Sequence, residues 1–193
     1  EPMKRNVAAE PHHDPLGEIL ASRKLLDPGL LAARLDQAAR EKSSLEATLL
    51  RAGTFSRAQL LQMLENHYFC PSVDASKVSF RPDLLHRVPR RVAERCEAIP
   101  VDFDGEKLVV ALANPTQLAV DGLSTAIRAT VLPRVALRVD LLDAIRVAYD
   151  RYEEEANAAE RLHKCSSFLA NGPATPDGGI VFGQLFMWNG YAG

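Results

Sequence analysis

The chain has 193 residues, of which 47% are hydrophobic and 25% charged, a balance that suits one globular domain or two small subdomains and argues against disorder. The formal net charge is -2, so no overall positive field gathers DNA or RNA, and we expect no nucleic-acid partner. Three widely spaced cysteines without a CxxC pair argue against a disulfide framework or a zinc knuckle and suit a reducing compartment.

Residues 1–13 are expected to be a flexible lead-in, because they combine two prolines with the His12-His13 pair. No further ligand lies at helical spacing from the pair, so we expect no metal site there. Neither a signal peptide nor an apolar run of the ~20 residues that a membrane span needs is found. We therefore predict a soluble, cytoplasmic protein without direct membrane insertion.

Residues 14–70 contain two copies of one unit. Shifting the sequence by 29 residues, from Pro15 to Ser44, brings apolar positions into register. In each copy we expect a short helix, a tight turn and a longer helix, whose N-cap is Asp27 or Ser56. The pairs that align are Leu16 with Leu45, Leu20 with Leu49, Leu26 with Phe55, Leu31 with Leu60 and Leu35 with Leu64.

Residues 71–160 are expected to form a small α/β subdomain with about three strands, so the predicted fold class is α+β. Pro89 should divide a helical stretch at 82–97, and Asp104-Gly105 should join two strands through a type I′ turn or a close relative. The remaining elements are predicted as a helix capped by Thr116, a third strand at 134–139 and a last helix capped by Asp140 and ending near Lys164.

Residues 161–193 are expected to be a linker and an apolar tail, since Gly and Pro are frequent there and no charge follows Asp177. The apolar end, from Ile180 to Tyr191, could dock on the domain or on a partner. The alternative is a segment with no role.

Known catalytic motifs are missing from this sequence, so we predict that the chain is not an enzyme. It contains no GxxxxGK[ST] phosphate loop, no GxSxG elbow and no HExxH helix. His67, His86 and His163 are isolated from one another, and Cys70 and Cys96 are expected to be small buried hydrophobes. An enzyme that uses one of these thiols or imidazoles stays open as an alternative.

Four arginines lie close together in the predicted helical stretch around Pro89. On one helical face these arginines could meet an acidic protein partner, and the alternative is an ordinary solvated face. The cluster consists of Arg87, Arg90, Arg91 and Arg95.

Four stretches carry a family resemblance: "LGEIL…LLDPGLLAARL", "LEATLLRAGTFSRAQLLQML", "RVPRRVAERCEAIPVDFDGEKLVVALANPTQL" and "DAIRVAYDRY". Together they resemble the N-terminal domain of type II secretion and type IV pilus assembly ATPases (the GspE N-terminal and MshEN types) over residues 14–152. The MshEN type binds cyclic-di-GMP. In this family the ATPase chemistry belongs to a separate downstream domain.

The resemblance implies a ligand site built from both copies. Each family copy opens with a polar-Leu-Gly start, has a Gly at the turn and ends near a Gln, so the candidate ligand residues are those at the matching positions. They are Leu16, Gly17, Leu20, Lys24, Leu45, Leu49, Gly53 and His67.

This chain departs from the pattern at several positions. Pro15 and Ser44 stand where the polar openers belong, and Ala38 replaces the terminal polar residue of the first copy. Glu46 stands in place of a Gly and would repel a ligand that carries two phosphates, while Arg23, Lys24 and Arg51 could compensate in part.

We therefore predict a non-catalytic interaction or regulatory module that docks to a protein partner, such as a component of the secretion or pilus machinery, and needs no cofactor. The alternative is a degenerate cyclic-di-GMP sensor. The sequence leaves the oligomeric state open.

Overall fold

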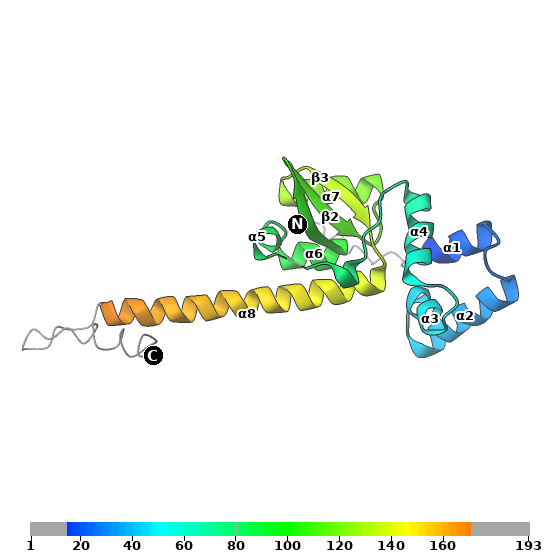
Figure 1. Ribbon diagram of the computed structural model, residues 1–193, viewed down its shortest axis with the longest axis horizontal. Coiled ribbons are helices and arrows are strands. Elements are labelled where there is room, and N and C mark those ends of the chain that lie inside the picture. The colour runs from blue at the N-terminus through cyan, green and yellow to red at the C-terminus, as the bar shows by residue number, and fades with distance from the viewer. Residues whose placement is uncertain (1–14, 80, 171–193) are drawn as a thin grey trace, which may run out of the picture. The chain divides into compact units, whose positions relative to one another are not determined.

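The computed structural model describes residues 15–79 and 81–170, with side chains up to residue 161. The chain divides into two units, one ending at Tyr149 and one beginning at Asp150, and each is described by itself. In the described part of the first unit, short helices precede a small mixed sheet (Figure 1). The fold class is α+β, as predicted.

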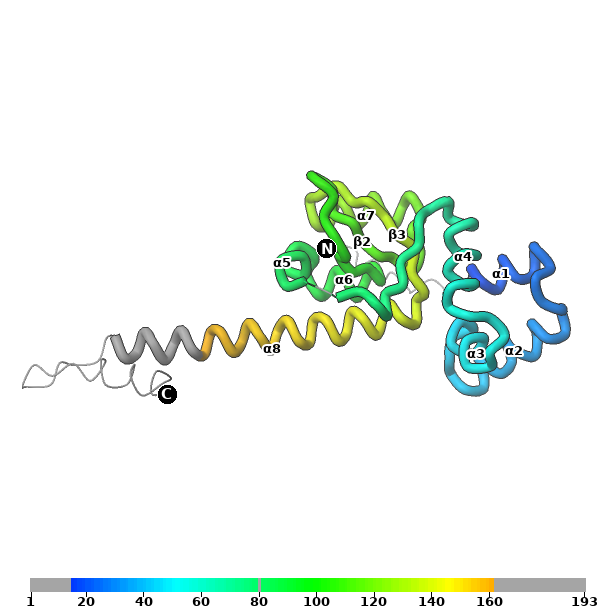
Figure 2. The backbone as a smooth tube through the Cα atoms, viewed as in Figure 1, coloured from blue at the N-terminus to red at the C-terminus, as the bar shows by residue number. Residues whose placement is uncertain are grey.

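The first unit begins with two helical pairs, drawn from blue to cyan in Figure 2. Asp27 accepts hydrogen bonds from the backbone N–H groups of Gly29 and Leu30, and Ser56 forms a complete capping box with Gln59, which confirms both predicted N-caps. The four helices are α1 (Pro15–Ser22), α2 (Pro28–Glu41), α3 (Leu45–Arg51) and α4 (Arg57–Tyr68).

The turn inside each copy has the same backbone geometry. After α1, Lys24 adopts a left-handed conformation with φ 52°, and the Leu25 N–H bonds to the Leu20 carbonyl. After α3, Gly53 has φ 63°, and the N–H of Thr54 bonds to the carbonyl of Leu49. Both turns are Schellman motifs, and they lie at equivalent positions of the repeat.

Both copies share one hydrophobic core. Leu16, Leu20 and Leu49 are fully buried and Leu45 is 3% exposed, and all four belong to a cluster that also contains Val135 and Leu137 from the second half of the unit. The helical repeat is therefore packed against the end of the last strand and the start of the last helix.

The second half of the unit contains a three-stranded sheet in the order β1-β2-β3. β1 and β2 are antiparallel and β2 and β3 are parallel, and Ser72 forms a parallel bridge to Val135 beside β3. The elements are η1 (Ala75–Lys77), α5 (Pro82–Leu85), α6 (Arg90–Cys96), β1 (Ala98–Asp104), β2 (Lys107–Leu112), α7 (Gln117–Ile127), β3 (Val131–Val135) and α8 (Arg138–Ala170).

Local signals predicted several of these elements correctly. Pro89 separates α5 from α6, and the Thr116 hydroxyl accepts the Ala119 N–H at the start of α7. Asp104 pairs with Lys107 across a two-residue hairpin turn. Gly105 has φ 62°, whereas Glu106 is not among the residues with positive φ. A type I′ turn needs two positive φ angles, so this turn is not type I′ but a related two-residue turn.

The predicted third strand is present, but its predicted bounds, 134–139, and the predicted N-cap at Asp140 were wrong. β3 spans Val131–Val135, and α8 already begins at Arg138. Apolar residues continue to alternate past Val135, but the backbone N–H groups of Arg138 and Val139 donate to a distant carboxylate instead of a strand. Asp140 lies in the first turn of α8 and binds Arg57 with its carboxylate.

The second unit is described from Asp150 to Ala170, where α8 continues past the predicted end near Lys164. Among the residues described, we find no helix with the length and hydropathy needed to cross a membrane. The lead-in 1–13 and the apolar end 180–191 lie outside the described residues.

Candidate functional site

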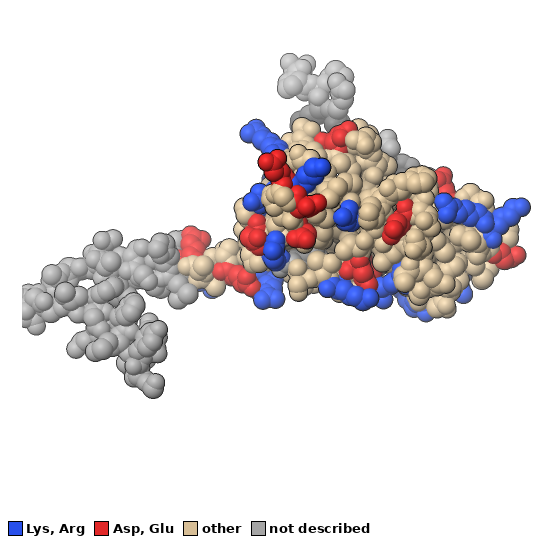
Figure 3. Space-filling model, turned by 45° about the horizontal axis from the view of Figure 1, so that its top comes forward, with Lys and Arg blue, Asp and Glu red and all other residues tan. Residues whose placement is uncertain are grey.

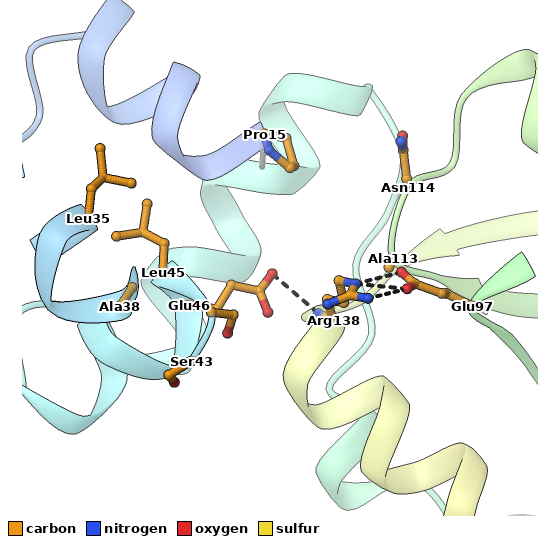
Figure 4. A pocket seen from close by; sticks show the side chains of 11 residues that line it. Pro15, Leu35, Ala38, Ser43, Leu45, Glu46, Glu97, Ala113, Asn114 and Arg138 are labelled. Carbon is orange, nitrogen blue, oxygen red and sulfur yellow. Dashed lines mark hydrogen bonds and ion pairs between the residues drawn. The ribbon is translucent and has the colours of Figure 1, made fainter. Parts of the chain in front are cut away.

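A pocket of about 350 Å³ lies between the helical repeat and the first turn of α8 (Figure 4). The helices α1 to α3 and the segment before α3 form one side. The residue before β1, the two residues after β2 and the start of α8 form the other. It is lined by Pro15, Leu35, Ala38, Ser43, Ser44, Leu45, Glu46, Glu97, Ala113, Asn114 and Arg138.

The first residues of the two copies, Pro15 and Ser44, both line this pocket. Pro15 is the first residue of α1, and Ser44 is the N-cap of α3, where its hydroxyl accepts the Ala47 N–H at 3.1 Å. Ala38, from the terminal polar position of the first copy, lines the same side. The fold therefore brings together three positions at which this chain departs from the family pattern.

The side chain of Glu46, on α3, binds the start of α8. Its carboxylate oxygens accept the backbone N–H of Arg138 at 3.2 Å and that of Val139 at 2.9 Å, and the residue is 6% exposed. A carboxylate at the N-terminus of a helix satisfies N–H groups that have no partner within the helix and is favoured by the helix dipole.

Two ion pairs also hold the first turn of α8. The Arg138 guanidinium donates through Nε to both oxygens of Glu97 at 2.8 Å. Asp140, 9% exposed, accepts Nε of Arg57 at 2.9 Å and its terminal nitrogen at 3.1 Å. The hydrogen bond from Arg57 to Asp140 and the Asp140 charge raise the pKa of that guanidinium above its ordinary value.

The pocket therefore combines an apolar wall with two carboxylates and one guanidinium. All three charged side chains already bind protein groups, so a phosphate entering the pocket would face an excess of negative charge. The described residues contain no group of three or more metal-binding side chains. The arrangement suits a weakly polar ligand better than a dinucleotide phosphate.

The candidate ligand leucines lie in the core. Leu16, Leu20 and Leu49 have no exposed surface, and Leu45, which lines the pocket, is also buried. At Gly17 a Cβ atom would lie 3.8 Å from a Leu45 methyl group, an ordinary contact. Packing thus accounts for these positions, and their role in ligand binding stays a prediction.

The other candidate ligand residues do not converge on this pocket. Lys24 and His67 are exposed, and His67 meets Tyr68 edge to face at 4.8 Å between ring centroids. Gly53 lines a second, wider hollow between α3, α4 and the segment 72–77.

Five residues that line the pocket were not singled out from the sequence: Ser43, Glu97, Ala113, Asn114 and Arg138. Ala113 and Asn114 belong to "ALANPTQL", part of the family resemblance, so that motif was the one available signal. Nothing near Glu97 or Arg138 in the sequence indicates that they form an ion pair across 41 positions.

The predicted partner-binding arginines lie on one short stretch. Arg90 pairs with Glu94 at 2.8 Å, and the Arg87 guanidinium lies 4.9 Å from the centroid of the Phe103 ring. Arg91 and Arg95 are exposed on α6 and form no ion pair with any residue that the structure describes. In the view of Figure 3, basic and acidic side chains are interspersed.

The two described cysteines differ in burial. Cys70 is buried, as predicted, and its thiol lies 3.3 Å from the Pro133 carbonyl; burial raises its pKa. Cys96 is only half-buried, contrary to the prediction, because it is the last residue of α6, where the chain turns at Glu97 into β1.

Comparison with known proteins identifies relatives of this chain. Residues 68–155 match the MshEN domain family. The type IV pilus assembly ATPase PilB of Myxococcus xanthus is 27% identical over 135 residues, which cover 69% of this chain and 24% of PilB. The chain thus aligns with about a quarter of the length of that relative.

Two solved structures are similar in part. A structure of MshE with cdg is 25% identical, with a TM-score of 0.49, over 72% of this chain and 99% of the MshE chain. The N-terminal domain of XpsE is 22% identical, with a TM-score of 0.45, over 67% of this chain and 90% of that domain. The family match relates residues 68–155 to the MshEN domain, and the PilB alignment relates the chain to a type IV pilus assembly ATPase.

Proposed function

We propose that this chain is a non-catalytic interaction module that docks to a protein component of a type IV pilus or type II secretion machine. The observation that carries the proposal is the MshEN match over residues 68–155 together with the alignment to a pilus assembly ATPase. The matched segment contains the whole sheet and both helices of the arginine stretch.

The exposed arginines of α6 supply the contact surface in this proposal. Arg91 and Arg95 are four residues apart and therefore lie on one face of the helix, and neither is engaged by a described carboxylate. An Arg fork binds a carboxylate through two parallel hydrogen bonds. The partner surface should therefore be acidic.

Calorimetric titration with the cytoplasmic domain of the machine's membrane platform protein tests this proposal. We expect saturable binding that weakens at least tenfold in the double variant Arg91→Glu/Arg95→Glu, since each lost charge-assisted contact costs about 1.5–3 kcal/mol. The control is Arg146→Glu, which changes an exposed arginine on α8 that pairs only locally with Asp143. Equal binding by all three proteins would contradict the assigned surface, and no binding would contradict the docking itself.

The absence of catalysis is part of the proposal and has its own test. The sequence lacks a phosphate loop, so the purified chain should neither bind ATP tightly nor hydrolyse it. Turnover that a point mutation within the chain abolishes would overturn the assignment.

A degenerate cyclic-di-GMP sensor is the second candidate function. The specific observation in its favour is that the openers of both copies, Pro15 and Ser44, line one pocket. Against it, Glu46 adds a carboxylate to that pocket. Titration with cyclic-di-GMP separates a dinucleotide sensor from a protein-binding module.

A further inference from the structure

Helix α8 begins without a capping side chain of its own. The residue at its N-cap position is Leu137, whose carbonyl accepts the Leu141 N–H at 2.9 Å and whose side chain is buried in the core of the helical repeat. A leucine has no atom that can accept the first N–H groups of a helix. The partners of these groups must therefore come from elsewhere in the fold.

Glu46 supplies them from α3. It accepts the N–H groups of Arg138 and Val139, which are 92 and 93 positions away in the sequence. Both carboxylate oxygens are used, one for each N–H. Hydrogen bonds to an ionised group in a buried setting are among the stronger polar contacts in proteins.

The same turn is held from two further directions. Arg57 at the start of α4 binds Asp140 through two hydrogen bonds, and Glu97 beside β1 binds the Arg138 side chain. One helical turn therefore collects contacts from both helices of the second pair, α3 and α4, and from the residue that precedes β1. Three of the residues involved, Glu46, Glu97 and Arg138, also line the pocket.

We propose that Glu46 acts as a remote cap that makes the start of α8 depend on the position of the helical repeat. A movement of α3 away from α8 removes the cap, and the backbone N–H groups of Arg138 and Val139 then lose their hydrogen-bond partner. Three residues at this contact, Glu46, Glu97 and Arg138, also line the pocket. This inference does not rest on the docking proposed above.

Amide hydrogen exchange of the full chain, followed by NMR, tests the remote cap. In Glu46→Ala we expect the Arg138 and Val139 amides to exchange about tenfold faster or more, because a charge-assisted hydrogen bond is lost. Glu46→Gln, whose single side-chain oxygen accepts more weakly, should give an intermediate increase. The amides of β2 should exchange as in the unmodified chain.

The matched control is Glu41→Ala, which removes an exposed carboxylate that pairs with Arg51 and lies outside the pocket. It should leave the amides of Arg138 and Val139 unchanged. The proposal is overturned if these two amides keep their exchange rates in Glu46→Ala. It is also overturned if the amides of β2 accelerate to the same extent, since the effect would then be a general loss of stability. If the alanine variant does not fold, unchanged rates in Glu46→Gln contradict the proposal.

Discussion

Lys24 and Gly53 occupy the left-handed position of the turn in the two copies, and their residue types give that conformation a different energetic cost. Both adopt a left-handed backbone at equivalent positions of the repeat, yet only glycine does so without strain. For other residues the left-handed conformation costs about 1–2 kcal/mol. The first copy thus keeps the geometry of the turn at an energetic cost.

Exchanging the residue types at these two positions tests this difference. We expect Lys24→Gly to raise the free energy of unfolding by roughly 0.5–1 kcal/mol, since relief of backbone strain exceeds the added chain entropy of glycine. Gly53→Lys should lower it by about 1–2 kcal/mol, although a Cβ there meets no atom within 4 Å. Urea denaturation measures both free energies of unfolding. A decrease in Lys24→Gly or an increase in Gly53→Lys would show that the two turns are not equivalent.

The Cys70 thiol provides a second prediction at this scale. Burial raises its pKa, so its contribution to stability is complete below the pKa of the unfolded thiol and is lost as the pH rises through the higher folded value. Stability relative to Cys70→Ala should therefore fall in alkaline solution. Denaturation at several pH values checks this, and a difference that stays constant with pH would count against the burial.

At the scale of elements, the repeat was predictable because its signals are local. Caps, turns and apolar spacing lie within a few residues of one another, so Asp27, Ser56 and Thr116 were identified as N-caps from sequence alone. The start of α8 was not predictable, because Glu46 caps it from a distant segment. The end of β3 was missed for the same reason.

Leucines at equivalent positions of the two copies should contribute similarly to the free energy of unfolding. Leu20 and Leu49 are both fully buried in the shared core, so Leu20→Ala and Leu49→Ala should each lower the free energy of unfolding by roughly 2–5 kcal/mol. Leu30→Ala, at a position that is 40% exposed, is the control and should have a much smaller effect. A nearly neutral result at either core position would show that this copy is not packed as described.

Tyr149 forms a hydrogen bond between α8 and the turn before α6. Its hydroxyl donates to the Val88 carbonyl at 2.5 Å, and both residues are buried. Tyr149→Phe keeps the ring but leaves that carbonyl unsatisfied, so we expect a loss of about 1–3 kcal/mol. Thermal unfolding measures the loss, and an unchanged midpoint would mean that water replaces the hydroxyl.

At the scale of the first unit, the candidate site was only half predictable. The repeat pointed to Pro15 and Ser44 at matching positions, and both line the pocket. Glu97 and Arg138, on the other side, come from the second half of the unit. No periodicity in the sequence indicates which residues two halves bring together, so this side of the pocket required the structure.

Restoring the family pattern should create a dinucleotide site only when Glu46 is also changed. Each new Arg contact contributes about 1.5–3 kcal/mol, so the variant Pro15→Arg/Lys24→Gly/Ser44→Arg/Glu46→Gly should bind cyclic-di-GMP a hundredfold or more tighter than the unmodified chain. The control keeps Glu46 and should gain little, because the carboxylate repels phosphate. Equal gains in the two variants would contradict the role given to Glu46.

Isothermal titration of cyclic-di-GMP into the unmodified chain most directly distinguishes a protein-binding module from a dinucleotide sensor. We predict no saturable heat at micromolar ligand, because Pro15 and Ser44 supply no long polar side chain and Glu46 holds a carboxylate at the start of α8. Saturable binding of one ligand per chain with micromolar affinity would contradict this and establish the chain as a sensor.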